Sequence, residues 1–166
     1  MMRGQKIVEE AGNEAPRQDL LFVCSSGGHL AQLMTLRLWW ENYPRRWVTF
    51  DLPDSHTRLK GEETIWCYSP TTRNVKNLFR NFFVATRTLR DRRPDVIIST
   101  GAAVAVPFFL LGAALGIPRI YIEVIDRVET PTLTGRICGH LTRNSCVQLE
   151  EQLVMYPKAR VIGTLL

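Results

Sequence analysis

Two segments of small residues could bring the backbone close to a ligand. The first, Ser25-Ser26-Gly27-Gly28-His29, joins an apolar run to a helical pattern. Its glycines allow close approach, and the unpaired N–H groups of a helix start attract an anion. Its spacing matches neither G-x-G-x-x-G nor G-x-x-x-x-G-K-[ST], so it is weak evidence for any nucleotide. The turn is either an ordinary tight turn after a strand or a phosphate contact. The second segment, Ser99-Thr100-Gly101-Ala102-Ala103, is a similar turn into a helix.

Two side chains could act as a general base. His29 follows the first glycine turn, and its imidazole titrates near working pH, although it could equally cap or pack against the helix. Glu123 directly continues the apolar segment 120–122, where an unpartnered carboxylate is costly to bury. We expect it to be paired with Arg127 or kept for a ligand. Asp126 could join the site or only cap the following turn.

The elements that must position these residues follow from the hydrophobic pattern. From Leu20 onward, apolar runs of strand length alternate with helical patterns, which predicts βαβ units and a parallel sheet. Six strands are expected, over residues 20–25, 47–51, 64–68, 95–100, 119–124 and 145–149. Five helices are expected, over residues 29–40, 74–91, 103–115, 131–140 and 150–156.

Ligands of such sheets lie outside the carboxyl ends of the strands. The two glycine turns, His29 and Glu123 should therefore meet in one crevice. The predicted fold class is α/β, a single Rossmann-like, doubly wound parallel sheet. It is expected over residues 19–166, after a flexible leader at residues 1–18.

Composition and charge narrow the function classes. The chain has 166 residues, 45% hydrophobic and 22% charged, which excludes a disordered, collagen-like or coiled-coil polymer. A net charge of +5 favours phosphates, nucleic acid or acidic lipid as partners. The sequence offers no base-stacking or groove-reading element for nucleic acid, and no dinucleotide fingerprint for a stand-alone epimerase or oxidoreductase. The four cysteines form no C-x-x-C pair, so we expect buried thiols and no metal site.

Two segments could contact a membrane. Residues 102–117 are uncharged but fall short of the roughly 20 residues that span a bilayer, which predicts a buried or membrane-surface helix. Residues 73–93 carry seven basic residues and one acid in an amphipathic pattern, so their aromatic side chains either face the core or contact anionic lipid. In the second case the membrane or lipid contacts are Arg73, Lys76, Phe79, Arg80, Phe83 and Arg87. Trp39 and Trp40 are likewise either core residues or an exposed docking surface.

Six motifs, spread over about residues 20–166, together carry a family resemblance. They are SSGGHL at 25–30, WVTFD at 47–51, PDVIISTGAA at 94–103, YIE at 121–123, PTLTGR at 131–136 and VQLEE at 147–151. With them the chain resembles the acceptor-side subunit of a bipartite GT-B glycosyltransferase. It is similar to the bacterial exopolysaccharide protein PssD and to the membrane-recruiting subunit of the dolichol-pathway UDP-N-acetylglucosamine transferase. A more distant similarity is to the amino-terminal half of MurG.

The resemblance implies the half of a GT-B enzyme that holds a lipid-linked acceptor. A separate donor-binding subunit would hold most of the UDP-sugar, with no metal and no covalently bound cofactor. The implied reaction is inverting transfer to an undecaprenyl-pyrophosphate-linked saccharide in exopolysaccharide or capsule synthesis, with glucuronosyl transfer expected. The implied location is peripheral, at the cytoplasmic face of the bacterial inner membrane. The alternative is a non-catalytic membrane adaptor that stabilises a catalytic donor-binding subunit.

The same resemblance suggests roles for individual residues. His29 is expected to take the proton of the acceptor hydroxyl, with Glu123 as the competing base. Two arginines would balance phosphate charge or orient Glu123. The expected acceptor and phosphate contacts are Ser26, Gly27, Gly28, Gly101, Arg127 and Arg136.

Overall fold

The fold is a parallel sheet with helices on both faces. The structure is a computed structural model that describes residues 18–71, 74–128 and 130–165; the leader expected at residues 1–18 lies almost wholly outside this part. The strands are β1 (Leu20–Val23), β2 (Arg45–Phe50), β3 (Thr64–Cys67), β4 (Val96–Ser99), β5 (Arg119–Ile122), β6 (Asn144–Val147) and β7 (Arg160–Val161). The helices are α1 (Gly28–Met34), α2 (Arg37–Trp40), α3 (Pro53–Arg58), α4 (Val75–Asp91), α5 (Ala105–Ala114), α6 (Leu133–His140) and the 3-10 helix η1 (Glu150–Val154).

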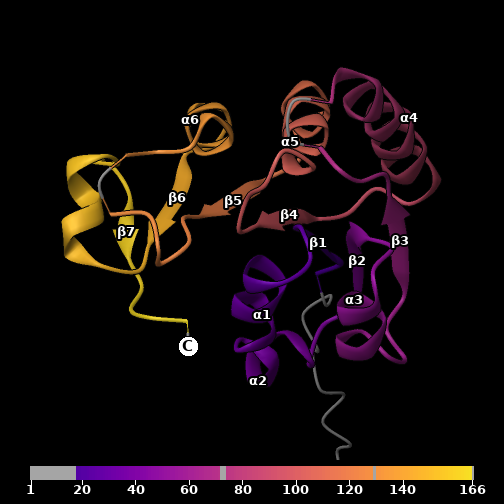
Figure 1. Cartoon of the computed structure of the whole chain (residues 1–166), viewed down its shortest axis with the longest axis horizontal. Coiled ribbons are helices and arrows are strands. Elements are labelled where there is room, and N and C mark those ends of the chain that lie inside the picture. Colours follow the sequence, from indigo (N-terminus) through magenta and orange to yellow (C-terminus); the bar gives the residue numbers. More distant parts are fainter. Residues whose placement is uncertain (1–17, 72–73, 129, 166) are drawn as a thin grey trace, which may run out of the picture.

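The strand order places a topological switch at the centre of the sheet. The order is β3-β2-β1-β4-β5-β6-β7, and every neighbouring pair is parallel. The chain therefore winds outward from β1 in one direction and then returns to wind outward from β4 in the other. Helices α1, α2 and α3 cover one face, and α4, α5 and α6 cover the other (Figure 1). This confirms the predicted Rossmann-like α/β fold class.

Each face of the sheet carries its own apolar layer. Leu21 and Val23 of β1 pack toward α5, where Phe108 is fully buried. Their neighbour Phe22 points to the opposite layer and stacks on Trp47, with ring centroids 4.4 Å apart. Burial on both faces explains why the central strands read as continuous apolar runs. Each large side chain buried here contributes about 1.5–3 kcal/mol to folding.

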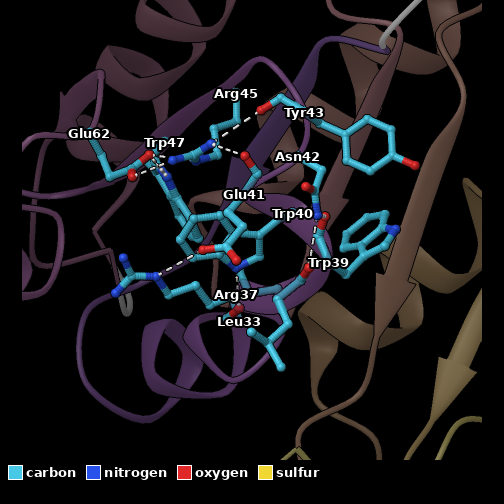
Figure 2. Close-up of polar contacts among 11 residues, drawn as sticks. Leu33, Arg37, Trp39, Trp40, Glu41, Asn42, Tyr43, Arg45, Trp47 and Glu62 are labelled. Carbon is cyan, nitrogen blue, oxygen red and sulfur yellow. Dashed lines mark hydrogen bonds and ion pairs between the residues drawn. The ribbon is translucent and has the colours of Figure 1, made fainter. Parts of the chain in front are cut away.

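The two adjacent tryptophans of α2 have different environments (Figure 2). Trp40 is 1% exposed, and its indole N–H donates to the backbone carbonyl of Leu33 at 2.9 Å. The guanidinium of Arg45 lies 4.5 Å from the Trp40 ring centroid and forms an ion pair with Glu62. Trp39, in contrast, is 43% exposed. Trp40 is thus a core residue, whereas Trp39 lies at the surface.

Several elements differ from the sequence prediction. The helix expected over 29–40 is two helices, because Leu36 leaves helical geometry with φ −81° and ψ 14°. Helix α3 and strand β7 were not predicted: α3 buries only Ser55, and both residues of β7 are exposed, so neither shows an apolar pattern. The segment expected as a helix over 150–156 is the shorter 3-10 helix η1.

Candidate functional site

A crevice lies at the carboxyl ends of the strands, at the switch point between β1 and β4. Its volume is about 1220 Å³, and its walls come from the segments that follow β1 to β5 and from α4, α5 and α6. His29, Asp126 and Arg127 lie in these walls. Segments that are up to about a hundred positions apart in the chain therefore form one cavity, at the position where the fold predicts a ligand.

His29 is fixed in the crevice by two reciprocal hydrogen bonds. Its Nδ1 lies 2.8 Å from the backbone carbonyl of Thr100, and the Thr100 hydroxyl donates to the backbone carbonyl of His29 at 2.9 Å. Because a carbonyl oxygen only accepts, Nδ1 must carry a hydrogen, and in the neutral ring Nε2 then holds the free lone pair. Burial lowers the pKa of His29 below its usual value of 6.5, which favours that neutral ring near pH 7. A neutral imidazole with a free Nε2 lone pair can accept a proton.

Glu123 lies outside the crevice walls and has partners other than those expected. It is 1% exposed, and its Oε2 accepts hydrogen bonds from the hydroxyls of Tyr121, at 3.1 Å, and Tyr156. Its Oε1 accepts from the backbone N–H of Val124 at 3.2 Å. Within the described ranges no ion pair joins Glu123 to Arg127, so of the two alternatives for Glu123 the pairing with Arg127 is wrong. The tyrosine hydroxyls satisfy the carboxylate instead. Burial raises the pKa of both tyrosines, which therefore stay protonated donors.

The first glycine turn already holds a carboxylate of the protein. Gly27 has φ +73°, and its N–H donates to Asp54 Oδ2 of α3 at 3.0 Å. The walls of the crevice contain the flanking residues of this turn, Ser25 and His29, rather than Ser26, Gly27 or Gly28. Phosphate contact by this turn stays a prediction, with one of its amide donors occupied by Asp54.

Gly101 is required by its close neighbours. Its φ is +107°, and a Cβ at this position would lie 3.3 Å from the Tyr121 hydroxyl oxygen and 3.5 Å from His29 Cε1. Any side chain here would be strained and would press on both rings. The second small-residue turn thus brings the backbone against His29 and Tyr121.

The two arginines expected at the site lie in different places. Arg127 is exposed and lines the crevice. Arg136 lines a second cavity of about 510 Å³, beside α6 and the segment between η1 and β7. That cavity also contains Arg143 and Lys158. The structure therefore brings Arg127, but not Arg136, to the crevice.

A buried glutamine network supports one wall and was not predicted. The Gln152 side chain is 0% exposed and donates to the backbone carbonyls of Val124 at 2.8 Å and Arg127 at 2.9 Å. Gln148 is 2% exposed and donates to the carbonyl of Glu123 at 3.0 Å. These amides fix the segment that carries Asp126. Glutamine is usually a surface residue, so residue type alone does not point to this network. The one signal in the sequence is position, because Gln148 lies in the VQLEE motif and Gln152 directly follows it.

The outer side of α4 presents apolar and basic side chains. Val75, Phe79 and Phe83 are 65%, 63% and 77% exposed, whereas Ala85 and Leu89 of the same helix are buried. Of the two alternatives for this segment, the core-facing one is confirmed for Ala85 and Leu89, whereas Phe79 and Phe83 face outward. Three of the basic residues expected beside them are exposed, and these are Lys76, Arg80 and Arg87. Arg73 lies outside the described residues.

Helix α5 decides between a buried helix and a membrane-surface helix for the apolar segment 102–117. Phe108 and Phe109 are fully buried, so this segment forms a core helix, with Leu110 and Leu115 partly exposed at 38% and 44%. No helix in the described part of the chain has the length and apolar character needed to cross a membrane. Across residues 18–71, 74–128 and 130–165, no three His, Cys, Asp or Glu side chains are grouped as a metal ion would need.

Comparison of the fold with solved structures shows the class of protein to which the chain belongs. The chain matches the solved structure of MurG from Acinetobacter baumannii with a TM-score of 0.63 and 16% identity, over 79% of this chain and 41% of that one. It matches the UDP-GlcNAc 2-epimerase from Neisseria meningitidis with a TM-score of 0.69 and 13% identity, over 89% and 47%. The chain spans less than half of these proteins, and identities this low show the fold alone. It is a Rossmann-like domain equivalent to the amino-terminal half of a GT-B enzyme such as MurG.

The sequence then defines the family. Residues 66–165 match the family described as oligosaccharide biosynthesis protein Alg14 like, and the chain belongs to this family. It is 27% identical to the UDP-N-acetylglucosamine transferase subunit ALG14 of Rattus norvegicus, over 89% of this chain and 84% of the relative. With the subunit of the same name from Homo sapiens it shares 26% identity, over 95% and 88%. The predicted relation to GT-B glycosyltransferases is confirmed; the particular similarity to PssD stays a prediction.

Proposed function

We propose that the chain is the acceptor-side subunit of a two-chain glycosyltransferase. In this proposal the crevice holds a saccharide linked through pyrophosphate to a polyprenyl lipid, and a partner subunit holds most of the UDP-sugar donor. Membership of the Alg14-like family supports a subunit of this kind, because the matched relatives are named as transferase subunits. The observation that carries the catalytic part is the fixed tautomer of His29 in the crevice wall.

The chemistry follows from that tautomer. The acceptor hydroxyl gives its proton to Nε2 of His29, and the resulting oxygen nucleophile attacks the anomeric carbon of the donor sugar. The bond from that carbon to the UDP oxygen breaks, UDP leaves with the electron pair, and the configuration at the carbon inverts. Arg127, exposed at the crevice wall, is placed to balance the charge of the acceptor pyrophosphate.

The narrower identity of the substrates is also a proposal. We propose an undecaprenyl-pyrophosphate-linked acceptor in exopolysaccharide or capsule synthesis, with glucuronosyl transfer, and no metal or covalently bound cofactor. The matched relatives are named for UDP-N-acetylglucosamine, so that donor belongs in the same test. Donor choice resides in the partner subunit.

A transfer assay tests the catalytic role. This chain is purified with and without a donor-binding partner, and transfer from labelled UDP-sugars to lipid-linked glycans is measured. His29→Ala should lower turnover about 10²- to 10⁴-fold while the two chains still assemble. His140→Ala is the matched control, because His140 is exposed and its Nδ1 also bonds a backbone carbonyl, that of Arg136, outside the crevice. Near-normal turnover of His29→Ala would remove His29 from this role.

The same assay separates the alternative function. If the partner transfers sugar at full rate without this chain, the chain is a non-catalytic membrane adaptor. Both functions place it at a membrane surface, as a peripheral protein at the cytoplasmic face of the bacterial inner membrane. The exposed aromatic and basic side chains of α4 support that placement, since aromatic residues insert at the headgroup level and basic residues attract anionic lipid.

Vesicle binding tests the membrane surface. Phe79 and Phe83 together expose somewhat more than one complete phenylalanine side chain. Transfer of one phenylalanine side chain from water into lipid contributes about 2–3 kcal/mol to the free energy of binding. The double change Phe79→Ser and Phe83→Ser should therefore weaken binding to anionic vesicles roughly 30- to 150-fold. Leu38→Ser is the control, because Leu38 is 83% exposed and belongs to α2. Helix α2 lies on the face of the sheet opposite to α4 (Figure 1). Equal binding by both variants would exclude α4 as the contact.

A further inference from the structure

Glu123 is a buried carboxylate that the proposed chemistry leaves without a task. It is 1% exposed, and its described partners are hydroxyls and one backbone N–H, all of them neutral. A charge in such a position is costly, because desolvation is offset only by hydrogen bonds. A negative charge on this buried carboxylate acts on its neighbours with little screening by solvent.

Tyr121 connects this carboxylate with the crevice. Its hydroxyl donates to Glu123 Oε2 at 3.1 Å, so the hydrogen points toward Glu123 and the oxygen keeps its lone pairs for the other side. On that side is Gly101, whose Cβ position is 3.3 Å from the Tyr121 oxygen and 3.5 Å from His29 Cε1. The negative end of the hydroxyl dipole and the imidazole thus lie against the same glycine.

We infer that Glu123 is a positioning residue whose buried charge, extended by the Tyr121 hydroxyl, stabilises the imidazolium that His29 becomes when it takes a proton. The inference rests on the proposed function, in which His29 is the base. In this role Glu123 takes no part in the proton transfer. The proton moves from the acceptor hydroxyl to Nε2, and later from Nε2 to solvent in the open crevice.

Other groups also act on His29, and their exposure distinguishes them from Glu123. Burial lowers the pKa of His29, whereas the Thr100 carbonyl and the carboxylates of Asp126 and Glu123 raise it, and Arg127 lowers it again. Asp126 and Arg127 are exposed, so solvent and salt screen them, and they carry opposite charges. Glu123 supplies the buried and therefore persistent part of the field.

The test reads the protonation of His29 directly. The chain has three histidines, so the imidazole signals of the full-length protein can be assigned by substitution and titrated by NMR. Glu123→Gln removes the charge at nearly constant size and should lower the pKa of His29 by roughly one pH unit. The exposed His56 serves as internal reference, and Glu150→Gln, at an exposed position of η1, is the matched control that should change neither.

An unchanged or higher pKa of His29 in folded Glu123→Gln overturns the inference. If that variant does not fold, Tyr121→Phe decides: it keeps the buried ring, removes the hydroxyl dipole, and should lower the pKa of His29 by roughly half a pH unit. No change there overturns the inference as well.

In the two-chain enzyme, the acidic limb of the rate profile should move to lower pH as maximal turnover falls. Because the NMR titration needs no donor or partner, it can succeed even if His29→Ala leaves turnover intact, so the two failures are separable.

Discussion

Two glycines one helical turn apart in α6 offer a matched pair of substitutions. Both positions are helical, so replacing either glycine with alanine favours the helix by up to about 1 kcal/mol. Their surroundings differ. A Cβ on Gly135 would lie 2.7 Å from Glu123 Oε2 and 2.8 Å from the Tyr121 hydroxyl, and closer still to that of Tyr156. A Cβ on Gly139 would meet its nearest neighbour, the Tyr156 ring, at 3.4 Å.

The structure gives the expected magnitudes. A methyl group at position 135 must displace the carboxylate or the two hydroxyls that hydrogen-bond to it, and hydrogen bonds to a charged group contribute about 1.5–3 kcal/mol each. Allowing for the gain in helix propensity, Gly135→Ala should lower the free energy of unfolding by about 2–4 kcal/mol. Gly139→Ala should be neutral or slightly stabilising, because its nearest contact is at ordinary van der Waals distance.

Urea and thermal unfolding of the two variants measure this difference. For a chain of this size, the expected loss corresponds to a midpoint roughly 5–15 °C lower for Gly135→Ala than for the wild type. The slope of the urea transition should stay the same, since the two variants expose the same surface on unfolding. If Gly135→Ala were as stable as Gly139→Ala, Glu123 would not be held under α6 as described, and the reasoning would fail.

Three further outcomes are expected. Because the folded-state pKa of His29 lies below 6.5, the unfolded chain binds the proton more readily, so stability should fall as pH drops below about 6.5; His29→Gln should flatten that slope in urea titrations at several pH values. Asn81 is 0% exposed and hydrogen-bonds both the backbone N–H and the carbonyl of Tyr68. Asn81→Leu should therefore lower the free energy of unfolding by about 2–4 kcal/mol, measured by urea unfolding against wild type. Burial raises the pKa of the Cys24 and Cys67 thiols to about 12, so both should resist a thiol reagent until urea unfolds the chain.

The larger strands and helices were predictable because burial leaves a strong pattern in the sequence. The strands at the centre of the sheet are apolar on both faces, and α4 carries its own amino-terminal cap, with Asn74 accepting from the backbone N–H of Asn77. Strand β7 was missed because its two residues are exposed. The break between α1 and α2 was missed because Leu36 is neither glycine nor proline, and its departure from helical geometry depends on tertiary packing.

The candidate site was predicted in its location but only partly in its contacts. His29 and Arg127 could be placed in the crevice because both follow a strand, and parallel strands bring such positions to one edge. The partners of Glu123 could not be found in this way. Tyr156 is 33 positions away and comes from the segment after η1, and hydroxyl-to-carboxylate contacts over such separations leave no periodic signal. The choice of tyrosine over Arg127 depends on side-chain packing beneath Gly135.

The paired hydrogen bonds between His29 and Thr100 have a consequence for motion. They join the turn after β1 to the turn after β4 at two points, backbone to side chain in each direction. Neither turn can open without breaking both bonds, so the two should fluctuate as a single cooperative unit in hydrogen exchange, with similar opening free energies at their amides. Adjustment of the crevice to ligands of different size then falls to lining residues outside these bonds, among which Leu52 and Val75 are exposed.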